Sequence, residues 1–335
     1  MGLLELCYAT PIMTEQSITY YRTKNARKLM FGEYLKQLRE EIGLTQKELA
    51  TKLNLASTDF ASIDPVTISR WERGTTAPTT VKAIRILRVL TTDLMPFLIT
   101  LPSESGKGIF EEIVEYRFKS PWATLMSSSY DTQSKCNAIT ESQLLENDQD
   151  DYLTSLKHFF NSLSLDNKAL FDIDLYQYQL DNKMVARKYT DEESKEILGH
   201  SISFLFDANE LHQYFSSPFY PVPLQQARSY STSRAMAVCT ISRYSSIESV
   251  FWQNSAFGAK YVASHANIHD MYFYAVDHWS VNYMNSLDAE KIAFDTPDEN
   301  GIVKIGNQSF KRCLYRVDSA IWLSRPEIIE LLKRE

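Results

Sequence analysis

The 335-residue sequence predicts a multidomain protein, with an all-helical N-terminal region followed by an α/β C-terminal region. Over residues 31–98, apolar residues recur at helical spacing, with capping residues between the segments. After residue 152, segments typical of strands alternate with segments typical of helices. A polar stretch separates the two regions. We therefore divide the chain into an N-terminal arm, a helical domain, a linker and an α/β domain, at residues 1–29, 30–99, 100–151 and 152–335.

The helical region carries start and stop signals for consecutive helices. The first helix ends at Gly43, and its apolar face is formed by Phe31, Leu35, Leu38 and Ile42. Thr45 and Glu48 have the Thr-x-x-Glu spacing of a capping box, which predicts the start of the second helix. Asp64 followed by Pro65 places a capping residue and a first-turn proline at the start of the third.

The third predicted helix has an inward and an outward side. Ile68 and Trp71 are spaced to pack inward, and Gly74 ends the helix. The side chains that point outward, toward solvent or a groove, are Thr67, Ser69 and Arg70. The second and third helices therefore form an adjacent pair that leaves polar side chains on one surface.

The segments 44–50 and 66–74 together resemble the Cro/repressor-type (XRE) helix-turn-helix family, over about residues 31–98. In that family the second helix of the pair enters the major groove of DNA, and its N-terminal residues face the bases. The resemblance implies a DNA-binding domain in which the third helix here is the recognition helix. The alternative interpretation is a helical module that serves only protein contact.

The resemblance assigns roles to individual residues. It implies that Gln46 clamps a phosphate and braces the recognition helix, while Val66, Thr67 and Arg70 contact bases. Arg70 could bind guanine through two hydrogen bonds. The predicted DNA-binding residues are Thr45, Gln46, Val66, Thr67, Ser69, Arg70 and Arg73, with Thr45 and Arg73 as phosphate contacts.

One feature departs from the family pattern. The two paired helices are normally joined by a tight turn, whereas residues 54–64 make the connection several residues longer. The insertion could lengthen the turn or extend the second helix. It lies beside the predicted DNA face, where it could add backbone contacts and change the register of the recognition helix.

Charge is distributed unevenly along the chain, whose net charge is −7. Residues 1–100 hold 13 Lys and Arg against 10 Asp and Glu, so the acidic balance lies in the remainder. A mildly basic N-terminal region suits DNA binding through that region alone. Lys24, Arg27 and Lys28 in the arm could contact phosphate or form a solvated lead-in.

The sequence gives no sign of export or of a membrane span. No apolar run reaches the length that crosses a bilayer, and we recognise no signal peptide. The four cysteines are scattered, which favours reduced thiols over a disulfide framework or zinc ribbon. We expect a cytoplasmic protein.

The C-terminal region predicts strands at 171–180, 197–206, 235–241, 271–276 and 313–323, and helices at 247–265 and 279–293. From residue 233 the order of elements resembles the C-terminal half of GCN5-related N-acetyltransferases (GNAT). In that family a glycine-rich loop after a strand holds the pyrophosphate of the cofactor at a helix start.

The matching segment of this chain, residues 242–247, has no glycine, although Arg243 could bind an anion in another way. Tyr283 lies near the tyrosine acid of the family, about one residue out of register. We therefore expect a degenerate transferase fold without catalytic residues, in which Arg243 and Tyr283 are candidate ligand-binding residues.

The sequence predicts neither a metal site nor a bound cofactor. His265 and His269 are four residues apart and could share a helix face, but Asn267–Asp270 has the composition of a helix end. A small-molecule effector, such as an acyl-CoA-like compound, remains compatible with the α/β domain.

The combined interpretation is a sequence-specific transcriptional regulator that is not an enzyme. Its partners would be double-stranded DNA with a pseudo-palindromic operator, a second copy in a homodimer, and a small-molecule effector. Two alternatives are an acyl-CoA-dependent N-acyltransferase with a fused DNA-binding head, and an antitoxin- or phage-type repressor with a protein-binding C-terminal half.

Overall fold

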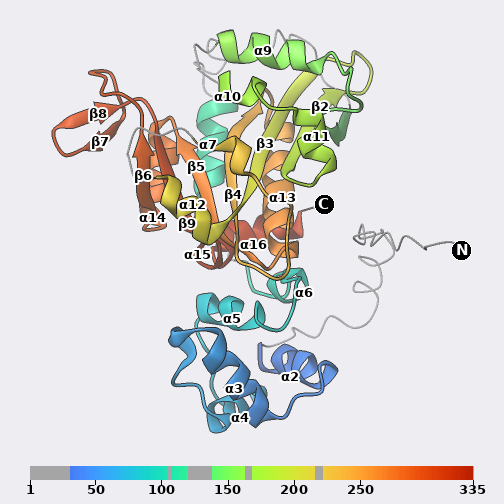
Figure 1. Ribbon diagram of the computed structural model, residues 1–335, viewed down its shortest axis with the longest axis vertical. Coiled ribbons are helices and arrows are strands. Elements are labelled where there is room, and N and C mark those ends of the chain that lie inside the picture. Colours follow the sequence, from blue (N-terminus) through green and yellow to red (C-terminus); the bar gives the residue numbers. More distant parts are fainter. Residues whose placement is uncertain (1–30, 104–107, 120–137, 163–167, 216–221, 335) are drawn as a thin grey trace, which may run out of the picture.

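The computed structural model describes residues 31–103, 108–119, 138–162, 168–215 and 222–334 (Figure 1). The predicted N-terminal arm, with its basic residues, lies outside this part of the chain. Figure 1 shows a small helical head at one end of the molecule and a larger mixed sheet with helices on both faces. We call residues 31–98 the head and residues 138–334 the sheet domain.

The head is a bundle of short helices whose starts follow from local capping signals. Its elements are α2(Phe31–Glu41), α3(Gln46–Ala56), η1(Thr58–Phe60), α4(Pro65–Glu72), α5(Thr80–Leu87) and α6(Met95–Leu98). Thr45 accepts a hydrogen bond from the Glu48 backbone N–H at 3.2 Å, and the Glu48 carboxylate accepts one from the Thr45 N–H at 2.8 Å. Asp64 accepts one from the Thr67 N–H at 2.7 Å. The predicted capping box and the predicted start of α4 are confirmed.

Glycines shape the head at two kinds of position. Gly43 and Gly74 have φ values of +70° and +68°, which side chains other than glycine rarely adopt, so they end α2 and α4 as predicted. Gly32 instead allows α2 and α4 to approach closely, because a Cβ there would overlap the backbone carbonyl of Trp71.

The insertion between α3 and α4 is an ordered part of the head. It extends α3 to Ala56 and then forms the 3₁₀ turn η1, so it does both of the things the sequence allowed. Phe60 and Ile63 are buried in the core of the head. The Asn54 side-chain amide donates to the Ala50 carbonyl at 2.6 Å and to the Ile63 carbonyl at 2.8 Å. These contacts fix the segment that leads into α4.

The sheet domain is built on a seven-stranded sheet with the order β1-β2-β3-β4-β5-β9-β6. Its strands are β1(Ile139–Gln143), β2(Met184–Asp191), β3(Ile197–Asp207), β4(Met236–Ser245), β5(Ile268–Ala275), β6(Glu290–Phe294) and β9(Cys313–Asp318). Neighbouring strands are antiparallel except β4 and β5, which are parallel. The pairing of β4 with β5 stops at Thr240 and Phe273, whereas β4 continues to Ser245. A small hairpin, β7(Val303–Ile305) with β8(Gln308–Phe310), projects beside β6 (Figure 1).

Helices cover both faces of this sheet. One face packs against α9(Tyr152–Ser162), α10(Lys168–Phe171), α11(Leu175–Leu180), α12(Ala208–Tyr214) and the turn η3(Leu224–Gln226). The other packs against α13(Glu248–Ser264), α14(His278–Ser286), α15(Ser319–Leu323) and α16(Pro326–Lys333). Strand alternation divides the core accordingly: Phe204 and Phe206 belong to the first cluster and Leu205 to the second. The predicted α/β domain is confirmed.

Three element predictions in this domain were wrong in part. Residues 171–180, predicted as a strand, hold the end of α10 and the helix α11, which Asp174 caps by accepting from the Gln177 N–H at 2.9 Å. Residues 313–323 form a strand only to Asp318, which caps α15. Residues 279–293, predicted as one helix, end as a helix at Ser286 and continue as β6.

Residues 100–151, predicted as a linker, contain regular structure. They include α7(Ile109–Val114), the short π-helical stretch η2(Glu115–Lys119) and β1. Strand β1 pairs with β2 from Ile139 opposite Asp191 to Gln143 opposite Arg187. The sheet therefore begins before residue 152.

The head and the sheet domain share one hydrophobic core. Leu94, Phe97 and Leu98 are buried in the same cluster as residues of α13, β5 and β9. Two backbone hydrogen bonds join the parts, from the Leu94 N–H to the Ala263 carbonyl at 2.8 Å and from the Ala266 N–H to the Thr92 carbonyl at 2.9 Å. The head is therefore packed directly against the end of α13.

Candidate nucleic-acid interface

The outward side of α4 carries the predicted base-contacting residues. Val66 is 53% exposed and Arg70 is exposed, while Thr67 and Ser69 are half-buried. The helical spacing places Val66, Arg70 and Arg73 along one side, opposite the buried Ile68 and Trp71. The structure thus places Val66, Arg70 and Arg73 on one accessible side, with the half-buried Thr67 and Ser69 on its two flanks.

The predicted phosphate-contacting residues flank this surface. Thr45 is exposed at the start of α3, and Arg73 is exposed at the end of α4. The Arg73 Nε–H donates to the Ser69 carbonyl at 3.1 Å, which holds part of its guanidinium against the helix. The Gln46 amide donates to the Glu72 carboxylate at 2.8 Å, a contact between α3 and α4 that agrees with a bracing role.

Sequence reasoning missed the ion pair behind Gln46. Arg39 of α2 contacts Glu72 through two hydrogen bonds, Nε to Oε1 at 2.6 Å and Nη2 to Oε2 at 3.1 Å. The hydrogen bonds that Arg39 donates to Glu72 raise the pKa of its guanidinium despite its desolvation. The two side chains are 11% and 5% exposed. Glu72 thereby joins the end of α4 to both preceding helices, α2 and α3. In the sequence, the only indication of this contact is that Glu72 follows the inward-facing Trp71.

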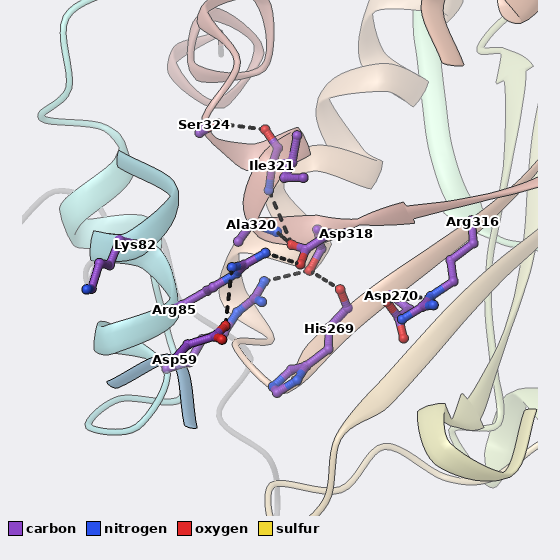
Figure 2. A network of polar contacts seen from close by, with 12 residues as sticks. Asp59, Lys82, Arg85, His269, Asp270, Arg316, Asp318, Ala320, Ile321 and Ser324 are labelled. Carbon is purple, nitrogen blue, oxygen red and sulfur yellow. Dashed lines mark hydrogen bonds and ion pairs between the residues drawn. The ribbon is translucent and has the colours of Figure 1, made fainter. Parts of the chain in front are cut away.

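A polar network connects the head to the sheet domain (Figure 2). Arg85 of α5 contacts the Asp318 carboxylate at 2.8 Å and lies 3.7 Å from the carboxylate of Asp59. Asp59 belongs to η1, in the insertion, and Asp318 ends β9 and caps α15. One arginine therefore bridges the inserted turn η1 and the end of the interior strand β9.

Arg88 adds a more deeply buried contact beside this bridge. Its Nη2 donates to the Ser319 hydroxyl at 2.5 Å and to the Ile268 carbonyl at 3.2 Å. Burial lowers the pKa of Arg88 to about 10, against the opposing charge of Asp318. Ser319 in turn donates to the backbone of β5, including the His269 carbonyl at 2.9 Å. The contacts reach strand β5 itself.

The two predicted ligand-binding residues lie near each other but differ in exposure. Arg243, on β4, contacts the Ser255 hydroxyl and lies over the ring of Phe251, 5.7 Å from its centroid. Desolvation by the surrounding protein atoms lowers its pKa to about 10, although the residue as a whole is exposed to solvent. Tyr283 is buried under Phe110, with ring centroids 5.6 Å apart, and burial raises the pKa of its hydroxyl.

The start of α13 is covered by the segment η2. Arg117 donates to the Ser245 carbonyl at 3.4 Å, and the Lys119 ammonium lies 3.6 Å from Glu248. Ile247 occupies the capping position and makes no side-chain hydrogen bond to the helix. The protein's own cations therefore lie at the helix start where the resemblance led us to look for a phosphate loop.

The two histidines considered as metal ligands do not share a helix. His265 follows the end of α13 and stacks on Tyr261, whose carbonyl lies 2.7 Å from its Nδ1. His269 lies on β5. Within the described ranges, no three His, Cys, Asp or Glu side chains are grouped so that they could hold a metal ion.

Comparisons with known proteins identify the family of one segment of the chain. Residues 35–96 match the family model of a helix-turn-helix, which confirms the predicted head. Comparison with curated proteins finds no match.

Among solved structures, Arabidopsis thaliana NAA60 in complex with a bisubstrate analogue is similar at 13% identity and a TM-score of 0.34, over 54% of this chain and 99% of that one. A probable acetyltransferase from Staphylococcus epidermidis is similar at 14% identity and a TM-score of 0.31, over 54% of this chain and 99% of that one. Ribosomal-protein-S5-alanine acetyltransferase from Vibrio fischeri is similar at 10% identity and a TM-score of 0.29, over 56% of this chain and 97% of that one.

These comparisons correct one expectation. The sequence led us to expect a protein that is not an enzyme, but the similar solved structures are acetyltransferases, and that expectation is wrong as stated. At this level of identity the similarity concerns the fold and assigns no reaction to this chain.

In the described ranges, no helix is both long and apolar enough to cross a bilayer.

Proposed function

We propose that this chain, whose head is a helix-turn-helix domain, is a sequence-specific transcriptional regulator that acts in the cytoplasm. The observation that carries the proposal is the accessible side of α4, where Val66, Thr67 and Arg70 stand at the positions that face bases in this class of domain. The ion pair of Arg39 with Glu72 and the contact from Gln46 hold the helix behind that surface.

Regulation by the sheet domain is the second part of the proposal. The bridge from Asp59 through Arg85 to Asp318, together with the shared core, gives a mechanical path from the sheet domain to the turn before the recognition helix. A small molecule bound in the sheet domain would act along this path. A homodimer on a pseudo-palindromic operator completes the proposal, because one such domain reads only a few base pairs.

The test separates base reading from phosphate contact. A preferred duplex is first selected from a randomised DNA pool with the wild-type protein. Binding to this duplex and to a scrambled one is then measured for Arg70→Ala and Arg73→Ala, with Arg228→Ala in the sheet domain as the matched control. We expect Arg70→Ala to reduce the preference by about 1–3 kcal/mol if Arg70 binds a base through two hydrogen bonds.

The other two variants have different expected effects on DNA binding. Arg73→Ala should weaken binding to both duplexes alike and reduce its salt dependence, because phosphate contacts release counterions. Arg228→Ala should change neither property. Full sequence preference in the Arg70→Ala protein would refute the proposed register of α4, and no duplex preference in the wild type would refute sequence-specific binding.

Acyl transfer by the sheet domain is the alternative function. The observation that favours it is the seven-stranded sheet with the parallel pair β4 and β5 inside it. Acyl transfer has a direct assay, in which release of free thiol from acetyl-CoA is followed in the presence of a peptide or amine acceptor. Turnover that Tyr283→Phe abolishes would establish it, with Tyr230→Phe as a control for the loss of a buried hydroxyl.

A further inference from the structure

A cavity of about 60 Å³ lies between α13 and the sheet. Strands β2 to β5 line one side of it and α13 lines the other, with Trp322 at one end. Since a water molecule needs roughly 10–15 Å³ of such space, the cavity has room for about five waters or for one small organic molecule. It lies in what would otherwise be the apolar layer between a helix and a sheet.

The strand face that lines the cavity is polar in its centre. Ser203 and Thr240 lie opposite each other on β3 and β4, and their hydroxyls are 3.0 Å apart. The next pair of cavity-lining residues on these strands is Ser201 opposite Arg243. Apolar residues follow at the far end, where Val238 pairs with Met271. The wall therefore changes from cationic through hydroxyl-bearing to apolar along its length.

Two buried polar atoms of cavity-lining residues, one on each side, have no hydrogen-bond partner among the described residues. They are the Ser201 hydroxyl and the Asn254 side-chain carbonyl, on residues that are 7% and 2% exposed. The Asn254 amide N–H₂ donates to the His200 carbonyl at 3.0 Å, which fixes the orientation of its side chain. Burying such a group without a partner is costly, so each of the two marks a place for a hydrogen-bonding molecule.

Arg243 supplies a positive charge at the exposed part of the cavity wall. Among the described residues no carboxylate forms an ion pair with it, and the nearby Arg117 is also cationic. Its guanidinium has five N–H donors, of which the contact with Ser255 uses one. Two neighbouring cations in surroundings crowded by protein atoms favour an anionic group beside them.

Gly258 keeps space open on the helix side. It lies inside the 17-residue helix α13, where glycine is less favourable than alanine. A Cβ at this position would meet no atom within 4 Å, so neither close packing nor a positive φ accounts for the glycine. Because Gly258 also lines the cavity, a side chain there would reduce the space available to a ligand.

We propose that this cavity binds a small carboxylic acid that carries a hydroxyl or amino group. Its carboxylate contacts Arg243, its hydroxyl or ammonium group donates to Asn254 and contacts Ser201, and its short aliphatic part lies in the remaining space of the cavity. Its use as the effector of DNA binding rests on the proposed regulatory function, whereas binding itself does not.

The test uses lactate and alanine as probes, with propionate lacking the donor and lactamide lacking the charge. We expect a dissociation constant of roughly 1 mM for such a small ligand. Each probe is therefore added to the full-length protein at about ten times this concentration, and thermal unfolding is recorded. A tenfold excess raises the folding equilibrium constant about elevenfold, which shifts the Tm of a chain of this size by about 2 °C. We expect this shift with lactate or alanine and a smaller one with propionate and lactamide.

Three variants separate a ligand site from a structural one. Gly258→Leu should leave the Tm without ligand unchanged or raised and should remove the response to the probes. Ser201→Ala should not lower the ligand-free Tm, since the hydroxyl has no partner among the residues that the structure describes, but should weaken the response. Gln253→Leu, at an exposed position of the same helix, is the control and should respond as the wild type does.

Two outcomes would overturn the assignment. One is the absence of a shift with every probe, and the other is an equal shift in the wild type and Gly258→Leu; either would leave the cavity as a place for water. Regulation is then read separately, from DNA affinity with and without the active probe. A bound probe that leaves DNA affinity unchanged refutes the effector role but keeps the site, and a wild type without DNA preference refutes only the proposed function.

Discussion

Replacing Glu72 by alanine tests whether the buried ion pair holds the recognition helix. The change leaves the Arg39 guanidinium, in a side chain only 11% exposed, with the Leu44 carbonyl at 2.8 Å and the exposed Glu40 at 3.3 Å. Removing one partner of a buried ion pair costs about 3–5 kcal/mol. Since these two acceptors remain, we expect a cost near the lower limit, about 3 kcal/mol.

Hydrogen exchange followed by mass spectrometry measures this effect locally in the full-length protein. A loss of about 3 kcal/mol should accelerate exchange at the amides of α4 by roughly a hundredfold. The matched control is Glu40→Ala, which removes a carboxylate from the same arginine. Glu40 is 56% exposed, so its loss should cost less than about 1 kcal/mol.

A double substitution tests the reasoning from the opposite direction. Arg39→Met combined with Glu72→Met removes both charges, and such replacements of buried pairs are often neutral or stabilising. The double variant should therefore exchange more slowly at α4 than Glu72→Ala. If Glu72→Ala and Glu40→Ala gave equal exchange rates at α4, the pair would not be what holds this helix.

Three further predictions follow from single residues. Gly32→Ala should destabilise the head by about 1–3 kcal/mol, because the added Cβ would overlap the Trp71 carbonyl. Gly258→Ala should not destabilise the protein, and equal denaturation midpoints for these two variants would contradict this reasoning. Burial lowers the pKa of His200 to about 3, so the unfolded chain binds the additional proton below pH 6.5, and this residue should contribute a loss of stability of about 2 kcal/mol between pH 7 and pH 5. His200→Gln should reduce the pH dependence of stability by this amount, and His158→Gln, at an exposed position, should not. Arg85→Met should cost only about 1 kcal/mol, because Arg85 and Asp318 are about one-third exposed, but should speed hydrogen exchange in both η1 and α15; a change confined to α5 would show that the bridge does not couple them.

The head could be predicted from the sequence because its signals are local. The capping box of Thr45 and Glu48, and the pair Asp64 and Pro65, act within one helical turn. The same kind of signal was overlooked at Asp174 and Asp318. Each caps a helix, and each lies in a segment that we predicted as a strand from its apolar residues.

The contacts between distant segments could not be predicted in this way. Arg85 and Asp318 are 233 positions apart in the chain, and no periodicity relates them. The cavity depends on which strands are neighbours, because Ser201 and Arg243 become opposite one another only through the register of β3 and β4. The resemblance identified Arg243 and Tyr283 together as candidate ligand-binding residues, but it could not show that Arg243 lines the cavity while Tyr283 is buried under Phe110.

The direct packing of the head on α13 has a consequence for operator geometry. Leu94 bonds to the Ala263 backbone inside a shared core, so the recognition helix keeps a set orientation relative to the sheet. In a homodimer held together by the sheet domains, the distance and the relative orientation of the two α4 helices would then be fixed. Adding about five base pairs between the half-sites would turn one of them to the opposite side of the duplex, and this protein has little freedom to follow it.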